Sequence, residues 1–238
     1  MPAAVSTQTR TNAKDGSVMI VIPAGEFVRG SNNGDDNEKP ERPVYLDEYA
    51  IQKYPVTVEQ YATYCRETRQ PMPQCPDWGW RPDHPVVNVD WHGAAAYAKW
   101  AGLALPTEAQ WEKAARGTDG RAFPWGNKWD PDRLCHSVGR ERSGTASVHT
   151  HEAGASPYGV VDMAGNVWEW CADWFQADYY ATAPSKNPAG PDRGESRVVR
   201  GGGWVGNDGL SFRGACRSWV DPLLRNVSIG FRCVSVPG

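Results

Sequence analysis

The N-terminal part of the chain alternates apolar and polar positions, a pattern that is typical of strands with one buried face. Residues 17–31 predict a strand, a Pro-Ala-Gly turn and a second strand, and residues 44–57 predict another half-buried strand. The acidic stretch between them, residues 32–43, predicts a solvated surface loop because charged and polar side chains dominate it. Residues 1–16 are polar, so we expect a frayed tail ahead of one folded domain that spans residues 17–238.

Three later segments have the caps and the apolar spacing of helices. Each follows a side chain that can accept a hydrogen bond from the first turn, and these expected N-caps are Thr57, Asp90 and Thr107. Gln60 and Gln110 lie three residues after the two threonines, which predicts two capping boxes. The second helix is expected to stop at Gly102 and the third at Gly117. Beyond the third helix the apolar positions follow no regular period, so short strands, glycine turns and loops are expected.

Composition fits one compact domain with much irregular structure. Of the 238 residues, 40% are apolar and 22% are charged, which is enough apolar material for a buried core. The chain has 12 Trp beside 25 Gly and 19 Pro, so turns fixed by large aromatic side chains are expected. A net charge of −3 gives no reason to expect binding to nucleic acid. No apolar run reaches the roughly 18 residues of a membrane span and no secretory signal is visible, so a cytoplasmic location is expected.

Cysteines and histidines do not form a recognisable metal motif. The six cysteines lie at positions 65, 75, 135, 171, 216 and 233, and none belongs to a CxxC pair, so a zinc site is not expected. Cys65 and Cys75 either close a local loop or remain separate thiols. His149 and His151 lie two residues apart, but no third ligand has a suitable spacing. The glycines at 201–203 lack the strand and helix of a nucleotide-binding loop and predict a tight backbone crossing instead.

Eight phrases of the chain resemble, in the same order, those of the formylglycine-generating-enzyme, or sulfatase-modifying-factor, family. They are IPAGEFVRGS (22–31), YPVTVEQYATYC (54–65), PVVNVDWHGAAAYAKWAG (85–102), LPTEAQWEKAARG (105–117), FPWGN (123–127), YGVVDMAGNVWEW (158–170), VVRGGGW (198–204) and IGFRC (229–233). The resemblance implies an α+β, C-type-lectin-like fold. In such a fold, few helices surround small twisted antiparallel sheets and much of the chain is loop.

The resemblance also indicates which chemistry this chain lacks. Family members that convert a sulfatase cysteine to formylglycine hold copper between two cysteines, and the matching positions here are Gly206 and Ser211. Soft Cu(I) prefers thiolate ligands, so neither copper nor copper-dependent formylglycine synthesis is expected. Cys216 and Cys233 match disulfide positions of some secreted relatives, but alanines occupy the two partner positions, 98 and 115, so those bridges are not expected.

The family pattern places a calcium site in a turn of the C-terminal half. By this resemblance the ligands are the side chains of Asp162 and Glu169 and the backbone carbonyls of Gly165 and Val167. These hard oxygen donors suit Ca²⁺, so we expect a structural ion there. The alternative is that the two acids cap the turn or form ion pairs within it. A second family calcium site needs an Asp near Arg140 and is expected to be lost.

Residues 204–228 depart most from the usual family pattern. Many relatives carry asparagines between the RGG and IGFR phrases, whereas this chain carries large apolar side chains, which often mark an interface when exposed. The arrangement resembles the variable proteins of diversity-generating retroelements. The residues expected to contact a ligand are Trp204, Val205, Asn207, Leu210, Ser211, Phe212, Ser218, Trp219, Val220, Leu223, Leu224 and Val227. The alternative is that about half of these side chains pack inward.

The sequence therefore predicts a non-catalytic ligand-binding module that presents residues 204–228 to a protein or a small molecule. Two alternatives stay open. One is an enzyme of the wider family whose chemistry does not use copper, although no catalytic base can be nominated for it. The other is a regulatory or structural accessory domain.

Overall fold

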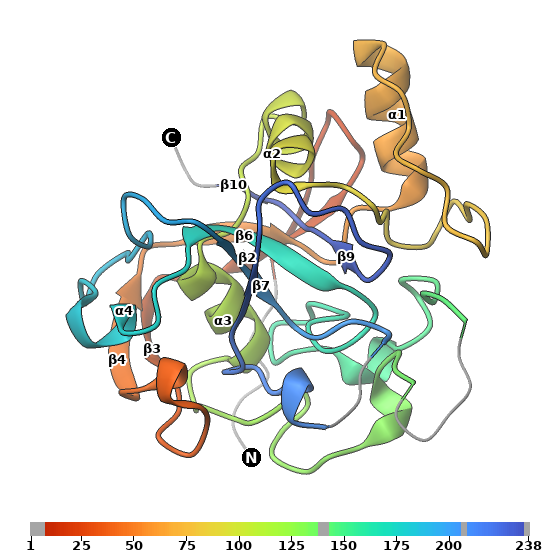
Figure 1. Cartoon of the computed structure of the whole chain (residues 1–238). Helices are drawn as coiled ribbons and strands as arrows, with labels where there is room; N and C mark the ends of the chain where they lie inside the picture. Colours follow the sequence, from red (N-terminus) through yellow and green to blue (C-terminus); the bar gives the residue numbers. More distant parts are fainter. Residues whose placement is uncertain (1–7, 138–142, 206–208, 236–238) are drawn as a thin grey trace.

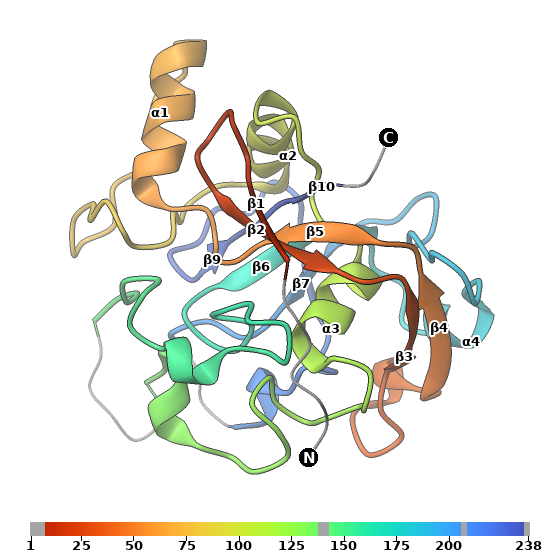
Figure 2. The ribbon, with the colours of Figure 1, turned by 180° about the vertical axis from the view of Figure 1, so that it is seen from behind.

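The computed structural model describes residues 8–137, 143–205 and 209–235. Two four-stranded sheets and one two-stranded sheet form the centre of the molecule. Helices α1 and α2 lie on one side of these sheets and α3 lies on the other (Figures 1 and 2). Long loops cover much of the rest, so the α+β class with few helices and small antiparallel sheets is confirmed. In the described ranges, no helix is long and apolar enough to cross a membrane.

One four-stranded sheet joins both ends of the described chain. Its order is β1-β2-β5-β10 and all its strands are antiparallel. The strands are β1 Thr9–Thr11, β2 Val18–Ile22, β5 Tyr49–Gln52 and β10 Val234–Ser235. A separate antiparallel hairpin consists of β3 Gly25–Arg29 and β4 Arg42–Leu46.

The second four-stranded sheet holds residues 204–228 at both ends. Its order is β8-β7-β6-β9, with β6 and β9 parallel and the other pairs antiparallel. The strands are β6 Trp168–Trp174, β7 Arg197–Arg200, β8 Ser218–Val220 and β9 Ile229–Gly230. Because β7 precedes the segment and β9 follows it, the same sheet fixes where the segment leaves and where it returns.

The three predicted helices are confirmed, with their caps. They are α1 Val58–Thr68, α2 Trp91–Trp100 and α3 Glu108–Arg116. Both threonine N-caps form complete capping boxes, and Asp90 Oδ1 accepts a hydrogen bond from the backbone N–H of Gly93 at 2.8 Å. Gly117 ends α3 as expected, whereas α2 ends two residues before the expected glycine. The remaining helical turns are α4 Tyr179–Thr182, η1 Asp36–Glu38, η2 Pro131–Arg133, η3 Glu152–Gly154 and η4 Leu210–Phe212.

Two hydrophobic clusters lie on opposite sides of the sheets. The first packs α3 against β2, β3, β4 and β5, and it includes the buried rings of Trp111, Phe27 and Tyr49. The second packs α1 and α2 against β6, β7 and β9, and it includes Tyr97 and Trp170. Burying each of these large side chains contributes on the order of 2 kcal/mol, so both helical layers are firmly attached.

The N-terminal part differs from expectation in its strand pairing. Residues 44–57 were expected to form one strand, but they include the end of β4 and the whole of β5, which belong to different sheets. Alternation alone cannot show this change, because both strands share the same period. Ordered structure also extends into the expected tail, since Thr9 of β1 pairs with Ile20 of β2.

Candidate functional site

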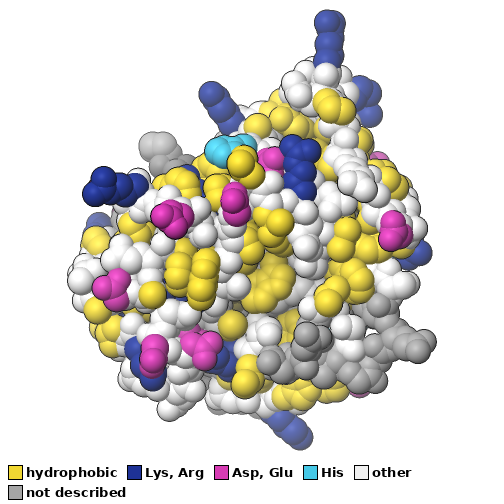
Figure 3. All heavy atoms as spheres, viewed as in Figure 1, with side chains coloured by type: hydrophobic (Ala, Val, Ile, Leu, Met, Phe, Trp, Pro, Cys, Tyr) yellow, Lys and Arg dark blue, Asp and Glu magenta, His cyan; other side chains and the backbone are white. Residues whose placement is uncertain are grey.

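Residues 204–228, which we call the display segment, carry most of the exposed apolar side chains. Six large apolar side chains are exposed in the described chain, and five of them lie in this segment. They are Val205, Leu210, Trp219, Leu223 and Leu224. The segment runs across the face shown in Figure 3, where apolar side chains are spread between polar ones. A ligand that approaches this face therefore meets these side chains.

The other predicted contact residues are less accessible. Half-buried positions are Trp204, Ser211, Ser218, Val220 and Val227. The prediction is wrong for Phe212, whose side chain is fully buried in a small cluster with Phe123 and Leu134. The turn η4 directs this ring inward while Leu210, in the same turn, stays on the surface. Asn207 and the expected copper position Gly206 lie outside the described residues.

Backbone contacts fix the start of the display segment. The glycines at 201–203 form the predicted tight crossing, because Gly202 has a φ of +77° and a Cβ there would lie 2.5 Å from Cδ1 of Phe212. A larger residue would clash with that ring and strain the backbone. The indole N–H of Trp204 donates a hydrogen bond to the carbonyl of Val227 at 3.0 Å. The two ends of the segment are thus joined directly.

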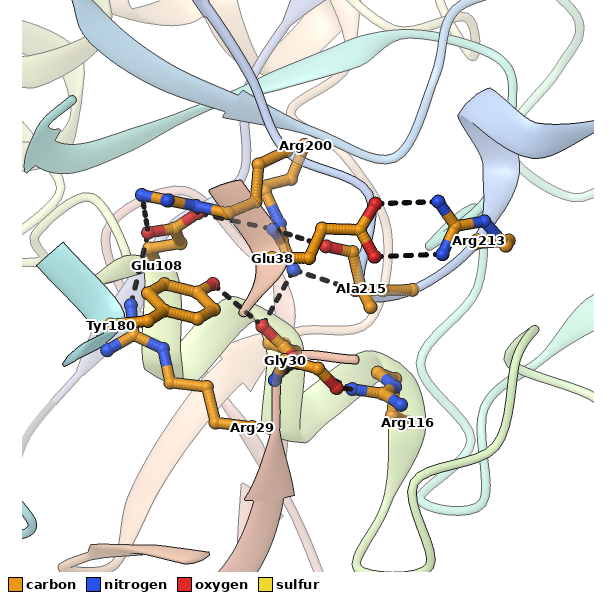
Figure 4. A network of polar contacts seen from close by, with 12 residues as sticks. Arg29, Gly30, Glu38, Glu108, Arg116, Tyr180, Arg200, Arg213 and Ala215 are labelled. Atoms are coloured by element: carbon orange, nitrogen blue, oxygen red, sulfur yellow. Dashed lines mark hydrogen bonds and ion pairs between the residues drawn. The ribbon is translucent and has the colours of Figure 1, made fainter. Parts of the chain in front are cut away.

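Buried ion pairs anchor the middle of the display segment (Figure 4). Glu108, at the start of α3, pairs with Arg29 at 3.1 Å, Arg200 at 3.2 Å and Arg217 at 2.7 Å. All four side chains are at most 1% exposed. Because Arg200 ends β7 and Arg217 immediately precedes β8, one carboxylate ties both strands to α3.

Glu112, one turn later on α3, extends this network. Its carboxylate accepts hydrogen bonds from Arg200 Nη2 at 2.9 Å and from the hydroxyl of Tyr180 at 3.1 Å. The guanidinium of Arg200 also donates to the backbone carbonyls of Gly214 and Ala215, at 2.7 Å and 3.2 Å. These two residues belong to the display segment, so the network holds its backbone as well as its side chains.

The acidic loop is part of the same anchor, which the sequence did not predict. Glu38 is fully buried, and its carboxylate accepts hydrogen bonds from Arg213 at 2.8 Å and 2.6 Å. The backbone carbonyl of Asn37 accepts another from Arg217 at 2.6 Å. The expectation of a solvated loop is therefore wrong at Glu38. A buried carboxylate is tolerated there because a guanidinium neutralises it.

Burial and neighbouring charges set the protonation states of the network. Burial raises the pKa of Glu108, but Arg217, Arg200 and Arg29 outweigh burial and lower this pKa to about 2. Asp173 lies beside Glu108 and accepts a hydrogen bond from its backbone N–H at 2.8 Å. Burial, and then the charge of Glu108, raise the pKa of Asp173 to about 7. Glu108 therefore stays ionised at neutral pH, whereas burial beside this charge favours the protonated form of Asp173.

A cleft of about 490 Å³, which we call the Trp204 cleft, opens beside the start of the display segment. Its walls include Cys75, Trp78, Arg225 and Val227. The rings of Trp78 and Trp204 meet edge to face, with their centroids 5.3 Å apart. The cleft thus offers aromatic surfaces, one thiol and one guanidinium to a bound molecule.

None of the six cysteines forms a disulfide. Five of them are buried, and Cys75 alone is exposed. The local bridge between Cys65 and Cys75 is therefore not formed.

The ring of His149, which the sequence singled out as a possible metal ligand, packs against Tyr54, with ring centroids 4.7 Å apart. In the ranges that the structure covers, no group of three or more His, Cys, Asp and Glu side chains is placed to hold a metal ion.

The predicted calcium turn brings its two acids into different surroundings. Asp162 has a φ of +57° and is 4% exposed. Its Oδ2 accepts a hydrogen bond from Asn166 at 2.9 Å, while Oδ1 is buried and has no hydrogen-bond partner among the described residues. Glu169 accepts two hydrogen bonds from Arg232, both at 2.7 Å, and one from the indole of Trp111 at 2.8 Å.

A hard cation fits Oδ1 of Asp162, which is unpaired among the described residues, better than the carboxylate of Glu169, which already accepts hydrogen bonds from Arg232 and Trp111. Burial raises the pKa of Asp162 to about 7, as expected for a carboxylate that lacks a counter-ion. The carbonyl of Gly165 accepts a hydrogen bond from the N–H of Val167 at 2.9 Å. Glu169 would have to share its oxygens with Arg232. The other family calcium position, near Arg140, lies outside the described residues.

The ion-pair network is the main functional feature that the sequence did not predict. One local signal pointed to it, because Glu108 and Glu112 lie four residues apart and so share one face of α3. That face is buried, so both carboxylates require cationic partners. Arg116, one turn after Glu112 on the same helix, is a local partner at 2.6 Å. The other partners, Arg29, Arg200 and Arg217, come from distant parts of the chain, and no local pattern identifies them.

Comparison with known proteins matches nearly the whole chain to one family. The family described as "Sulfatase-modifying factor enzyme 1-like domain" matches residues 3–236. The formylglycine-generating enzyme of Thermomonospora curvata is 34% identical over 285 aligned positions, which cover 92% of this chain and 93% of that protein.

Solved structures agree with this relationship. The structure of PvdO from Pseudomonas aeruginosa superposes with a TM-score of 0.84 at 27% identity, covering 96% of this chain and 97% of that one. Variable protein 1 of Treponema denticola superposes with a TM-score of 0.80 at 23% identity, covering 98% of this chain and 99% of that one, which shows a shared fold. The chain therefore belongs to the formylglycine-generating-enzyme, or sulfatase-modifying-factor, family.

Proposed function

We propose that the chain is a non-catalytic ligand-binding module whose display segment contacts a protein or a small-molecule ligand. The observation that carries this proposal is that five of the six exposed large apolar side chains of the described chain lie in residues 204–228. Exposed apolar groups that gather on one segment mark an interaction site more often than scattered ones do. Trp219 is 45% exposed and stacks on Phe175, with ring centroids 4.0 Å apart, so a large aromatic anchor is already held in position.

The copper positions support the non-catalytic part of the proposal. Gly206 has no side chain to offer and Ser211 offers a hydroxyl, whereas Cu(I) prefers thiolates. The test is to load the chain with Cu(I) and incubate it with a peptide that contains a sulfatase-type cysteine. We expect no formylglycine by mass spectrometry. Formation of formylglycine at a rate above that without protein would overturn this part of the proposal.

The display segment also separates anchors from surface positions, as a variable binding protein requires. Phe212, Arg213 and Arg217 make buried contacts, whereas Leu210 and Leu223, which precede and follow them in the sequence, are exposed. Exposed positions tolerate substitution with small changes in stability. We infer that the exposed positions differ between related copies of this gene while the anchors stay the same. Sequencing the segment from closely related strains tests this, and constant exposed positions would contradict it.

Binding itself is tested by selecting ligands from a random peptide library and a fragment library on the wild-type chain. Replacing Trp219, Leu223 and Leu224 together with Ser should weaken the selected ligands by more than about tenfold, because these side chains supply apolar anchors. Val18→Ser is the matched control, since Val18 is the sixth exposed large apolar residue and lies outside the segment. Equal affinity for the triple variant and the control would refute the display segment as the binding face.

The Trp204 cleft favours a second candidate, an enzyme of the wider family that does not use copper. The cleft has the volume of a small-molecule site and contains an exposed thiol, Cys75. This candidate predicts a reaction that Cys75→Ser abolishes. The binding proposal predicts instead that Cys75→Ser leaves the affinity of the selected ligands unchanged, provided that the variant melts at the wild-type temperature.

We also propose that the turn at Asp162 binds a structural calcium ion. The support is the buried Oδ1 of Asp162, which has no hydrogen-bond partner in the described chain and is a hard donor of the kind that Ca²⁺ takes. The carbonyls of Gly165 and Val167 and the carboxylate of Glu169 would be its neighbours. Such an ion would supply the positive charge that this buried carboxylate lacks.

A further inference from the structure

A second cavity, which we call the Arg225 pocket, lies next to the display segment. Its volume is about 460 Å³, within the range of small-molecule sites. It lies between α1, the start of α2 and residues 70–73, and its walls include Tyr61, Tyr64, Met72, Asn88, Asp90 and Arg225. Asn88 and Arg225 also line the Trp204 cleft, so the two cavities adjoin at these side chains.

The inner wall of the pocket is aromatic and firmly packed. The rings of Tyr61 and Tyr64 meet edge to face at 5.2 Å, and both contact the buried ring of Tyr97, at 5.7 Å and 5.6 Å. Both tyrosines are less than 10% exposed and belong to the second hydrophobic cluster. Met72 also lines the pocket and packs against this cluster, and its unbranched side chain can adapt to a bound group. Such walls favour a planar ring, which gains edge and face contacts.

The mouth of the pocket carries one exposed cation, the guanidinium of Arg225, which forms an ion pair with Asp90. Nε and Nη2 of Arg225 both donate to Oδ2 of Asp90, at 3.0 Å and 2.8 Å. Nη1 makes no hydrogen bond to any residue that the structure describes. The Arg225 side chain is 64% exposed, whereas that of Asp90 is 12% exposed and caps α2 through Gly93. A ligand therefore meets the guanidinium rather than the carboxylate.

We propose that the Arg225 pocket binds a planar aromatic group that carries a carboxylate. The ring would lie against Tyr61 and Tyr64, and the carboxylate would accept hydrogen bonds from Nη1 of Arg225, a charge-assisted contact stronger than a neutral one. This inference deepens the proposed function and rests on it, because Arg225 belongs to the display segment. The same chemistry is found in a free aromatic acid and in a peptide with an aromatic residue beside an acidic one.

The test is to titrate the ¹⁵N-labelled full chain with phenylacetate and with the uncharged phenylacetamide, following amide shifts by NMR. Phenylacetate should bind in the millimolar range or better and about fivefold more tightly than phenylacetamide. Arg225→Gln should remove this preference, while Arg81→Gln, which changes another exposed arginine, should keep it. The pocket is refuted if neither probe shifts its amides, or if Arg225→Gln leaves the preference unchanged.

A second variant separates filling of the pocket from loss of charge. Ala96 lines the pocket from an exposed position on α2, so Ala96→Trp should block both probes without disturbing the core. Ala181→Trp, at an exposed position on α4, is the matched control and should bind both probes like wild type. Binding of phenylacetate to Ala96→Trp with wild-type affinity would place the ligand elsewhere and overturn the inference.

Two further arms identify the ligand source and separate this inference from the proposed function. A peptide containing Phe-Asp that binds more tightly than phenylacetate, with the same dependence on Arg225, would identify a protein ligand. Weaker binding of the peptide would identify a free aromatic acid. If library-selected ligands require Trp219 while neither phenylacetate nor the peptide binds, the pocket is refuted and the display face stands. If the probes bind but replacing Trp219 does not change the affinity of the selected ligands, the display segment is refuted as the binding face and the pocket remains as a separate site.

Discussion

Replacing Glu38 with Gln tests whether the acidic loop holds the display segment in place. The carboxylate of Glu38 is fully buried and accepts two hydrogen bonds from Arg213, whose side chain is 18% exposed. The substitution keeps the shape of the side chain but leaves Arg213 without its counter-ion. Removing one partner of a buried ion pair costs about 3–5 kcal/mol. Because Arg213 keeps some contact with water, we expect the lower figure, about 3 kcal/mol.

Urea unfolding followed by tryptophan fluorescence measures this cost, and a thermal melt checks it. In a domain of this size 1 kcal/mol corresponds to roughly 2–4 °C, so the melting temperature should fall by about 6–12 °C. Hydrogen exchange should accelerate in residues 209–217, which contain Arg213. Glu41→Gln is the matched control, since Glu41 is an exposed acid in the same loop and should cost less than about 0.5 kcal/mol. Equal costs for the two variants, or unchanged exchange in residues 209–217, would refute the reasoning.

Three further results are expected. Calcium at about a hundred times its dissociation constant should raise the free energy of unfolding of the wild type by about 2.7 kcal/mol and leave that of Asp162→Asn unchanged. A wild-type melting temperature that does not change with calcium would contradict the proposed site. The pKa of Asp173 is raised from 3.8 to about 7, mainly by burial, so the folded state holds a proton between these values that the unfolded state releases. The contribution of Asp173 to the free energy of unfolding should therefore fall from about pH 4 to pH 7, and this fall should be absent in Asp173→Asn. Identical slopes of the unfolding free energy against pH in the wild type and in Asp173→Asn would contradict this prediction. In urea unfolding, Phe212→Ala should lower the free energy of unfolding by about 3–5 kcal/mol, and Leu223→Ala by less than about 0.5 kcal/mol. Similar losses for the two variants would contradict the finding that Phe212 is buried and Leu223 is exposed.

The helices could be predicted from the sequence because their signals are local. A threonine N-cap and the glutamine three residues later report on one turn of chain, and both capping boxes formed as expected. The crossing at Gly202 is local in the same sense, because a run of three glycines permits a close approach of the backbone to a neighbouring side chain such as the ring of Phe212. The family resemblance supplied the fold class, which the irregular second half of the chain does not reveal by its periodicity.

The strand pairing and the anchor of the display segment could not be predicted, because both depend on contacts between distant residues. The strands β4 and β5 follow each other closely in sequence yet belong to different sheets. Glu38 and Arg213, which form one buried ion pair, are 175 residues apart. Charged residues in a polar stretch normally indicate solvent, and only the partner from elsewhere makes burial of Glu38 possible. For the same reason the inward turn of Phe212 was missed, while its exposed neighbour Leu210 was placed correctly on the surface.

The most direct measurement is an amide hydrogen-exchange map of the chain with and without a ligand selected on the wild type. If the display segment is the binding face, protection on binding should be largest in residues 209–228, which contain Trp219 and Leu223. The buried peptides of α3 should change little, because the ion-pair network already holds them. Protection that falls mainly around Val18, or anywhere outside the display segment and its adjoining cavities, would contradict a binding function for this face.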